Sequence, residues 1–213
     1  MINISLAGIG GQGSVLAARI LAETARSKGW QVRTAETTGM AQRGGNVMSH
    51  VRMGDAGEEV FSPLPGQKSD DVVIALEPGE GLRALPLLKP KGLMVTASSG
   101  VAPIVADFKA QPYDPDRMVK ALQASGAHVV VVDDAALCES IGSRKALNII
   151  MLAVALQAAN TFEEIAVNGF SGQITLEEMR SAIATCVKPQ FQEMNNAAVS
   201  FVEEHIREYV EVR

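Results

Sequence analysis

The fold is set by residues 2–13, INISLAGIGGQG, a short alternating run that ends in a glycine-rich turn. Apolar side chains at Ile2, Ile4 and Leu6 alternate with polar ones, which is typical of a β-strand. Residues 14–28 carry apolar side chains at helical spacing and end at a glycine, so we expect a helix there. A second strand is predicted over residues 31–36. Together they form a β-α-β unit of about 30 residues, whose crossover is expected to be right-handed.

The remaining chain continues with strands in its first half and helices in its second. Val129–Val132 shows no alternation, so this run is expected to be buried on both faces of a parallel sheet. Turn residues at 54–57 suggest that residues 58–61 return as the arm of a hairpin. Further strands are expected at residues 47–53, 71–76, 92–96 and 128–133, and helices at residues 79–87, 114–125, 143–159 and 190–209.

Two Thr-x-x-Glu patterns, Thr161 with Glu164 and Thr175 with Glu178, predict capping boxes at helix starts. The order of elements predicts an α/β fold: a Rossmann-like, mostly parallel sheet with helices on both faces and a helical C-terminal part. We expect one domain over residues 1–213, with an α/β core at 1–135 and a helical extension at 136–213.

Composition excludes several classes of function. The net charge of −5 gives no basic footprint for nucleic acid or for a membrane surface. The N-terminus has no signal-peptide pattern, and the most apolar segment, residues 146–159, is too short to span a bilayer. We therefore expect a cytoplasmic protein that binds neither nucleic acid nor membranes.

The chain has only two cysteines, Cys138 and Cys186, and they form no CxxC pair. An iron–sulfur cluster needs four thiolates in most proteins, so we expect no cluster on this chain. Both cysteines are predicted to be small buried residues in a reducing compartment. No metal-ligand pattern and no catalytic residue is assigned.

The turn Gly8–Gly13 has the form GxGxxG between a strand and a helix. Such a turn points backbone N–H groups and a helix N-terminus at an anion. Glu36, at the end of the second strand, stands where a dinucleotide fold places its ribose-binding acid, although somewhat beyond the usual spacing of about 20 residues. The same form also serves as a plain packing turn. Gln12 at the tip suits contact with a partner or polar ligand, or it caps the following helix.

A second glycine block, GMAQRGG, occupies residues 39–45, in a connection that is long for a compact α/β unit. Gly44 and Gly45 permit close approach of the backbone, Arg43 can hold a phosphate or carboxylate, and Gln42 can hydrogen bond beside it. The alternative is a solvated loop or an internal salt bridge. His50 on the next strand is expected to be a surface or half-buried histidine, and Glu77 and Glu80 to be structural.

The two glycine blocks, in this order, resemble the gamma-type subunit of the 2-oxoacid:ferredoxin oxidoreductases. The Met-Ala-Gln form of the second block is similar to the beta subunit of the indolepyruvate ferredoxin oxidoreductases. The resemblance implies residues that bind a cofactor or lie at an interface: Gly10, Gly11, Gln12, Gly13, Gln42, Arg43, Gly44 and Gly45.

The resemblance also implies that this chain binds no cofactor alone and is inactive alone. Thiamine pyrophosphate and iron–sulfur clusters are expected in a large catalytic partner subunit, with coenzyme A as co-substrate and ferredoxin as acceptor. A homodimer of the isolated chain is left open. Two other functions stay open as well: a self-sufficient NAD(P)-dependent dehydrogenase and a non-enzymatic α/β ligand-binding module.

Overall fold

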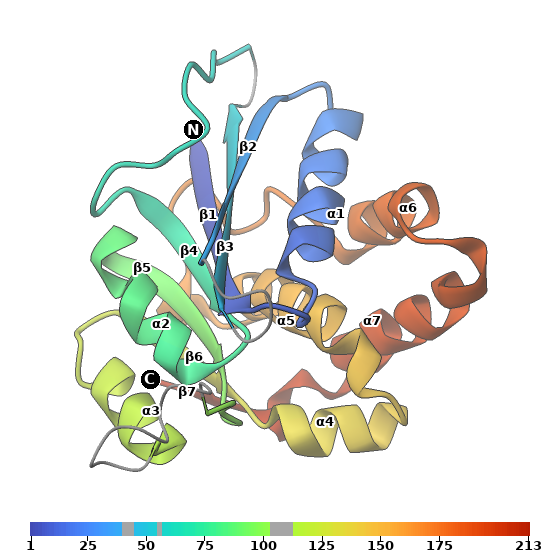
Figure 1. Cartoon of the computed structure of the whole chain (residues 1–213). Coiled ribbons are helices and arrows are strands. Elements are labelled where there is room, and N and C mark those ends of the chain that lie inside the picture. Colours follow the sequence, from blue (N-terminus) through green and yellow to red (C-terminus); the bar gives the residue numbers. More distant parts are fainter. Residues whose placement is uncertain (40–44, 55–56, 103–112) are drawn as a thin grey trace.

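The computed structural model describes residues 1–39, 45–54, 57–102 and 113–213, which form one mixed sheet with helices on both faces (Figure 1). The strands are β1 (Ile2–Ile9), β2 (Gln31–Thr38), β3 (Asn46–Gly54), β4 (Asp70–Ala75), β5 (Leu88–Ala97), β6 (His128–Val132) and β7 (Val210–Val212). The α-helices are α1 (Ser14–Ser27), α2 (Pro78–Ala84), α3 (Pro115–Gln123), α4 (Asp134–Ile141), α5 (Leu147–Thr161), α6 (Leu176–Cys186) and α7 (Pro189–Tyr209).

The sheet has the strand order β2-β3-β1-β4-β5-β6-β7. Its centre is parallel, because β1 pairs with β4, β4 with β5, and β5 with β6 in the same direction. Strand β3, which lies between β2 and β1, and the edge strand β7 run antiparallel to their neighbours. The predicted α/β class with a mostly parallel sheet is confirmed, and Val129–Val132 is buried as expected.

Strand β3 lies between β1 and β2, so the β-α-β unit at the N-terminus is split by a later strand. The predicted hairpin arm at residues 58–61 is wrong, since these residues form no strand. The physical reason is that both edges of β3 are already hydrogen bonded, to β1 and to β2, and a returning arm has no free edge to join.

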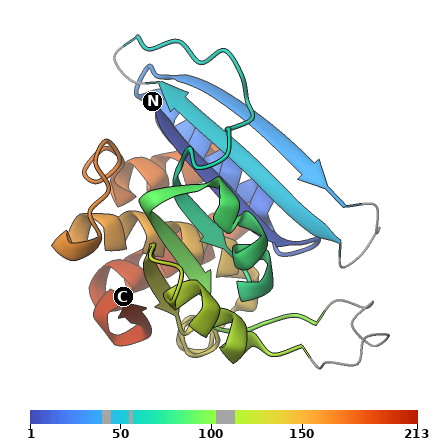
Figure 2. The ribbon, with the colours of Figure 1, turned by 90° about the vertical axis from the view of Figure 1, so that its left-hand side faces the viewer.

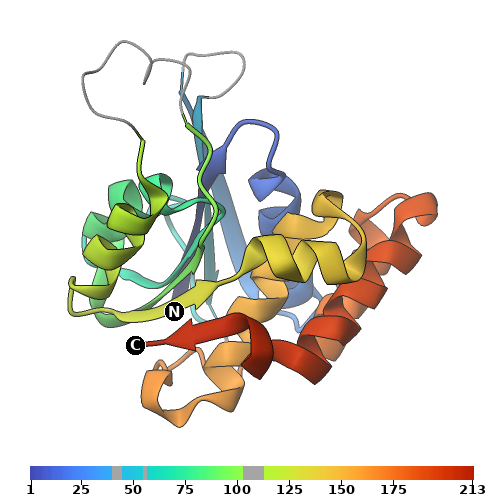
Figure 3. The same cartoon turned by 90° about the horizontal axis from the view of Figure 1, so that it is seen from below.

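The two faces of the sheet carry separate hydrophobic clusters. Helices α1, α5, α6 and α7 cover one face, and α2 and α3 cover the other (Figure 3). Helix α5 is buried on nearly all sides, with twelve of its fifteen residues buried, which explains the absence of an amphipathic pattern in its sequence. No single helix in the described ranges is long and apolar enough to cross a membrane; α4 and residues 144–161 pass only as a pair, bent by 118°.

The C-terminal half differs from the prediction in three places. Helix α4 was not predicted, and the long helix begins at Leu147, after a 3-10 turn at Arg144–Ala146. The capping box of Thr175 is present, but Thr161 ends α5 and caps nothing. After α7 the chain returns to the sheet, where β7 pairs with the outer edge of β6.

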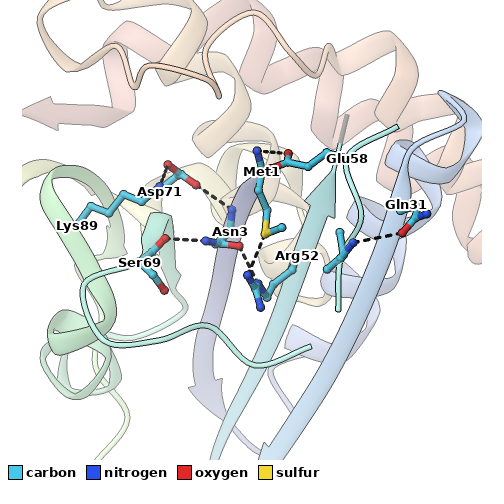
Figure 4. A network of polar contacts seen from close by, with 9 residues as sticks. Met1, Asn3, Gln31, Arg52, Glu58, Ser69, Asp71 and Lys89 are labelled. Atoms are coloured by element: carbon cyan, nitrogen blue, oxygen red, sulfur yellow. Dashed lines mark hydrogen bonds and ion pairs between the residues drawn. The ribbon is translucent and has the colours of Figure 1, made fainter. Parts of the chain in front are cut away.

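Residues 57–69 cross the sheet over β1 and β3 without regular structure, on the side seen in Figure 2. A network of polar contacts holds this segment (Figure 4). Arg52 on β3 donates through Nε to Asn3 Oδ1 at 2.9 Å and through Nη1 to the Ser62 carbonyl at 2.8 Å. Asn3 donates in turn to the Ser69 carbonyl at 2.8 Å. The side chains of two strands thus replace the hydrogen bonds that a hairpin would have supplied.

Candidate functional site at the carboxyl end of the sheet

The glycine turn after β1 is fixed by the side chain of Gln12. Its Oε1 accepts the Ile9 N–H at 2.7 Å, and its Nε2 donates to the Leu76 carbonyl at 3.1 Å, at the end of β4. The predicted alternative that Gln12 caps α1 is wrong, because the N-cap is Gly13 and no side chain caps this helix. Gly11 and Gly13 have φ angles of 101° and 84°, which L side chains rarely adopt.

The second glycine block meets the first at this end of the sheet. The Gly10 N–H donates to the Gly45 carbonyl at 2.9 Å, and the Gly39 N–H donates to the Asn46 carbonyl at 2.8 Å. Gln42, Arg43 and Gly44 lie outside the described residues. The structure therefore brings both blocks together through their described members.

Glu36 does not lie beside the glycine turn. It pairs in register with Ser49 on β3, and Ser49 pairs with Leu6 on β1, so Glu36 is two strands away from β1 and well below the turn. Neighbouring strands are about 4.8 Å apart, so Glu36 lies about 10 Å across the sheet from β1 and not on the adjacent strand, where a dinucleotide fold places its ribose-binding acid. This position of Glu36 counts against NAD(P) or FAD binding at the glycine turn.

A cavity of about 440 Å³ opens beside the glycine turn, in the size range of small-molecule sites. Its lining comes from four parts of the chain that are far apart in sequence. The lining residues are Gly11, Gln12, Gly13, Leu16, Val101, Arg144, Lys145, Leu147, Asn148, Val187, Phe191, Met194 and Asn195.

Three helices begin at this cavity, and the described structure gives none of them a side-chain cap. They are α1, α5 and α7, whose N-caps are Gly13, Ala146 and Lys188. Uncapped N–H groups and the helix dipoles make their starts favourable for negative charge. Asn148 links two of them, because its Nδ2 donates to the Gly13 carbonyl at 3.0 Å.

Arg144 and Lys145 add positive charge at the same place. The buried Asp134 accepts from Arg144 Nη2 at 3.2 Å and from the Ser99 N–H at 2.8 Å. It thereby ties the 3-10 turn before α5 to the loop that carries Val101 into the cavity. Lys145 is exposed and has no ion-pair partner in the described residues.

A separate buried cluster joins three strands below the turn. Ser5 Oγ donates to Asp70 Oδ2 at 2.5 Å and lies 2.7 Å from His50 Nδ1, which is therefore the donor to Ser5. His50 is buried, so the prediction of a surface or half-buried histidine is wrong. Burial raises the pKa of Asp70 to about 7 and lowers the pKa of His50. Ser5 and Asp70 are fully buried and His50 nearly so, which indicates a structural network and not a catalytic triad.

Glu77 and Glu80 act at the start of α2, as expected. Glu77 is its N-cap and accepts the N–H groups of Gly79 and Glu80, and it also accepts from the hydroxyl of Tyr113. Burial raises the pKa of Glu80. Glu77 thus satisfies backbone donors, and the Glu80 carboxylate pairs with Arg83 Nε at 3.2 Å, so both acids have structural partners.

The cysteines are free, as predicted, but only Cys138 is buried, while Cys186 is half-buried. Within the described ranges, no three His, Cys, Asp or Glu side chains gather where they could hold a metal ion.

Comparison with known proteins shows the family of this chain. The model of the pyruvate ferredoxin/flavodoxin oxidoreductase family matches residues 3–201. The chain belongs to this family. It is 32% identical over 200 residues to the indolepyruvate oxidoreductase subunit IorB of Archaeoglobus fulgidus, covering 93% of this chain and 92% of that one. It is 29% identical over 198 residues to the subunit of the same name from Thermococcus kodakarensis, with 92% and 91% covered.

Solved structures share the fold of this family member. Pyruvate oxidoreductase subunit PORC from Thermotoga maritima matches with a TM-score of 0.67 at 20% identity, over 99% of this chain and 97% of that one. The gamma subunit of a keto/oxoacid ferredoxin oxidoreductase from Geobacter sulfurreducens matches with a TM-score of 0.64 at 20% identity, over 96% and 97%. A third structure is 2-oxoglutarate:ferredoxin oxidoreductase from Magnetococcus marinus with 2-oxoglutarate, coenzyme A and succinyl-CoA bound. It matches with a TM-score of 0.60 at 18% identity, over 97% of this chain but 30% of that chain.

The glycine turn was predicted from the sequence, but most of the residues that line the cavity beside it were not. Arg144, Phe191 and Asn195 were assigned no role. No local signal points to Arg144, because the unpredicted helix α4 lies between β6 and this residue.

Proposed function

We propose that this chain is the gamma-type subunit of a 2-oxoacid:ferredoxin oxidoreductase that acts on an aryl 2-oxoacid such as indolepyruvate. The supporting observation is the family match over residues 3–201, together with relatives named as indolepyruvate oxidoreductase subunits along more than nine-tenths of both chains. The complex converts its 2-oxoacid to an acyl-coenzyme A and passes the electrons to ferredoxin.

We further propose that thiamine pyrophosphate and the iron–sulfur clusters belong to a larger partner subunit. The residues of this chain do not fit a cluster, because its two cysteines lie on α4 and α6 and four thiolates are needed. No step of the reaction is assigned to a side chain of this subunit.

In this proposal the glycine blocks contact the partner subunit or coenzyme A. The meeting of Gly10 with Gly45 supports it, because both blocks then present one surface at the carboxyl end of β1. Gly11 supports it too: it is exposed, and an added Cβ would meet nothing within 4 Å. Another molecule can approach this part of the backbone closely.

Reconstitution tests the subunit assignment. The lone chain is expected to contain no stoichiometric iron and to show no 2-oxoacid-dependent viologen reduction. Added to a large thiamine-containing partner, it is expected to restore turnover with indolepyruvate and coenzyme A. Turnover by the lone chain, or full activity of the partner without it, contradicts the proposal.

Arg43 is proposed to hold an anionic group of coenzyme A or a carboxylate of the partner, because arginine binds such groups through two parallel hydrogen bonds and lysine cannot. Arg43→Lys is expected to keep the melting temperature and to lose about 1.5–3 kcal/mol of one charge-assisted contact. That loss weakens subunit affinity, or raises the Michaelis constant for coenzyme A, roughly tenfold to hundredfold. Arg26→Lys, on the exposed last turn of α1, is the control. A lower melting temperature with unchanged affinity and Michaelis constant would make Arg43 a structural residue.

The dinucleotide alternative has its own test. Because Glu36 lies two strands from the turn, NAD, NADP and FAD are expected to bind the lone chain weakly or not at all in calorimetry. Micromolar affinity, about 8 kcal/mol of binding free energy, would favour the dehydrogenase.

We also propose a domain organisation, a location and an oligomeric state. The chain is proposed to be one domain, which the packing of α5 against β4 and β5 supports. It is proposed to work in the cytoplasm. A homodimer of the isolated chain is supported by the outer edge of β2, the first strand in the sheet order, which can pair with a second copy.

A further inference from the structure

We propose that a second cavity, at the amino ends of β4, β5 and β6, binds a small organic molecule through its phosphate group. This cavity has a volume of about 310 Å³, at the lower end of the range for small-molecule sites. Its lining comes from Lys68, from residues between Leu85 and Lys91, and from Ser125–Ala127. It lies at the opposite edge of the sheet from the glycine turn, because β4 runs parallel to β1 and that turn follows the carboxyl end of β1. The inference does not depend on the proposed function.

The backbone at this cavity adopts an unusual conformation at two lysines. Within the described ranges, only two residues other than glycine have a positive φ, and both line the cavity: Lys68 at 53° and Lys91 at 59°. This left-handed conformation is unfavourable for a residue with a Cβ, whereas glycine adopts it readily. Glycine occurs close to each position, at Gly66 and Gly92, yet lysine occupies the strained positions themselves. Residues held in such conformations gather at ligand-binding sites, so the two lysine side chains are the first candidates for recognition.

Positive charge exceeds negative charge around this cavity. Of its three lysines, Lys89 pairs with Asp71, whose Oδ1 accepts from Nζ at 2.5 Å (Figure 4). Lys68 and Lys91 are exposed and form no ion pair with any of the described residues. None of the described residues that line the cavity is acidic. Two ammonium groups are therefore available to an anion, in a chain whose net charge is −5.

A phosphate group fits these donors better than a carboxylate does. A phosphate monoester carries up to two negative charges and three acceptor oxygens, which two lysines from separate segments can approach from different sides. Ser125 adds a hydroxyl: its Oγ accepts the Ala127 N–H at 3.3 Å, so its O–H can donate to a ligand oxygen. Leu85, Leu88 and Pro90 supply an apolar wall for the organic part of the ligand.

The carboxyl end of α3 lies beside the cavity, and its dipole opposes an anion there. The carbonyls of Lys120 and Leu122 already accept the N–H groups of Ala124 and Ser125, both at 3.0 Å, so this helix end is partly capped. A helix end carries about half an elementary charge, whereas the two lysines carry two. The net field at the cavity therefore favours an anion.

Calorimetry on the full chain with phenyl phosphate, inorganic phosphate and phenol tests the class of ligand. Phenyl phosphate has both the charged group and an apolar ring, and each of the other probes lacks one of them. We expect phenyl phosphate to bind about fivefold or more tightly than inorganic phosphate, and phenol to show no binding at the same concentrations. Added salt should weaken the binding of phenyl phosphate, because the two ammonium groups are exposed.

Lysine variants locate the site. Lys68→Gln and Lys91→Gln each remove one charge and are expected to weaken phenyl phosphate binding about fivefold. Lys188→Gln, at an exposed lysine before α7, is the matched control and should leave binding unchanged. Lys68→Gly and Lys91→Gly remove the side chain and the unfavourable φ together. We expect both glycine variants to lose binding as the glutamine variants do, while the urea midpoint of unfolding stays level or rises.

Four results would overturn the inference. Absence of phenyl phosphate binding at millimolar concentration, or equal binding of phenol, would remove phosphate recognition. An equal loss of affinity in Lys188→Gln would mean that the anion responds to the overall charge and not to this cavity. Wild-type affinity in both Lys68→Gln and Lys91→Gln would place the anion elsewhere. A lower urea midpoint in the glycine variants, together with unchanged binding, would make both lysines structural residues.

Discussion

Replacing Asp70 with asparagine tests the charge state of the buried cluster that joins β1, β3 and β4. The Asp70 carboxyl is fully buried, accepts one hydrogen bond from Ser5, and keeps Oδ1 without a partner among the described residues. Burial therefore raises its pKa from 3.8 to about 7; the neighbouring Asp71 raises it as well, while Ser5, Lys89 and Arg52 act in the opposite direction.

The folded and unfolded chains release the Asp70 proton over different pH ranges. Between about pH 4 and pH 7 the folded chain keeps the proton on Asp70, whereas the unfolded chain has released it. The contribution of the protonated Asp70 to the free energy of unfolding is fully present below pH 3.8 and is lost as the pH rises through about 7. The difference between the two pKa values corresponds to about 4 kcal/mol in the free energy of unfolding.

Asp70→Asn does not titrate and keeps an oxygen that can accept from Ser5. It is therefore expected to gain stability relative to the wild type as the pH rises, by up to about 4 kcal/mol between pH 4 and pH 8. Burial lowers the pKa of His50. Neutral His50 therefore contributes to the free energy of unfolding in the opposite sense, and this contribution is lost as the pH falls below 6.5. Because His50 is present in both proteins, its contribution largely cancels in the difference.

The assay is urea unfolding of both proteins at half-unit steps from pH 4 to pH 8 and constant ionic strength, with the slope m checked for constancy. Asp116→Asn, an exposed acid in the first turn of α3, is the control and should follow the wild type. Parallel curves for Asp70→Asn and the wild type would refute the reasoning, because they would mean that folding does not change the protonation of Asp70.

Three further changes test other parts of the fold by the same unfolding assay. Gly11→Ala is expected to lower the free energy of unfolding by about 1–2 kcal/mol, because of its positive φ alone. Gly13→Ala is expected to cost about 1 kcal/mol more, because its Cβ would lie 2.8 Å from Asn148 Nδ2. Equal costs for the two variants would contradict this contact. Thr175→Ala removes the capping box of α6 and should cost about 1 kcal/mol. Leu152→Ala, at a fully buried position of α5, should cost about 2–5 kcal/mol, and a smaller loss would show that the surrounding core collapses into the space.

Local signals in the sequence predicted the local parts of the fold. The alternation of Ile2–Leu6 and the glycine turn after it depend on neighbouring residues only, so the strand, the turn and α1 were placed correctly. The same holds for the capping box of Thr175 and for the buried run Val129–Val132.

Pairing between strands could not be predicted in this way. The alternation at residues 47–53 identified a strand, but nothing in it says that the strand lies between β1 and β2. Val210–Val212 was missed because three residues are too few for a periodic pattern, and their hydrogen bonds to β6 come from tertiary contact.

The candidate site shows the same limit. The glycine blocks were found because glycine is unusual in itself, and Gly10 and Gly45 do meet. For Phe191 and Met194 on α7, the sequence predicted only a helix over residues 190–209. The first turns of α7 line the cavity, which helical spacing alone cannot show.

The insertion of β3 between β1 and β2 also sets an order of assembly. On a growing chain β1, α1 and β2 are made first, yet β1 and β2 are never neighbours and cannot hydrogen bond to each other. The first sheet contact must wait until residues 46–54 are made, and β3 then joins both strands at once. We expect the first two strands to stay unpaired during that interval, with edges that strands of other chains can join. The N-terminal end is therefore the region most prone to aggregation during synthesis.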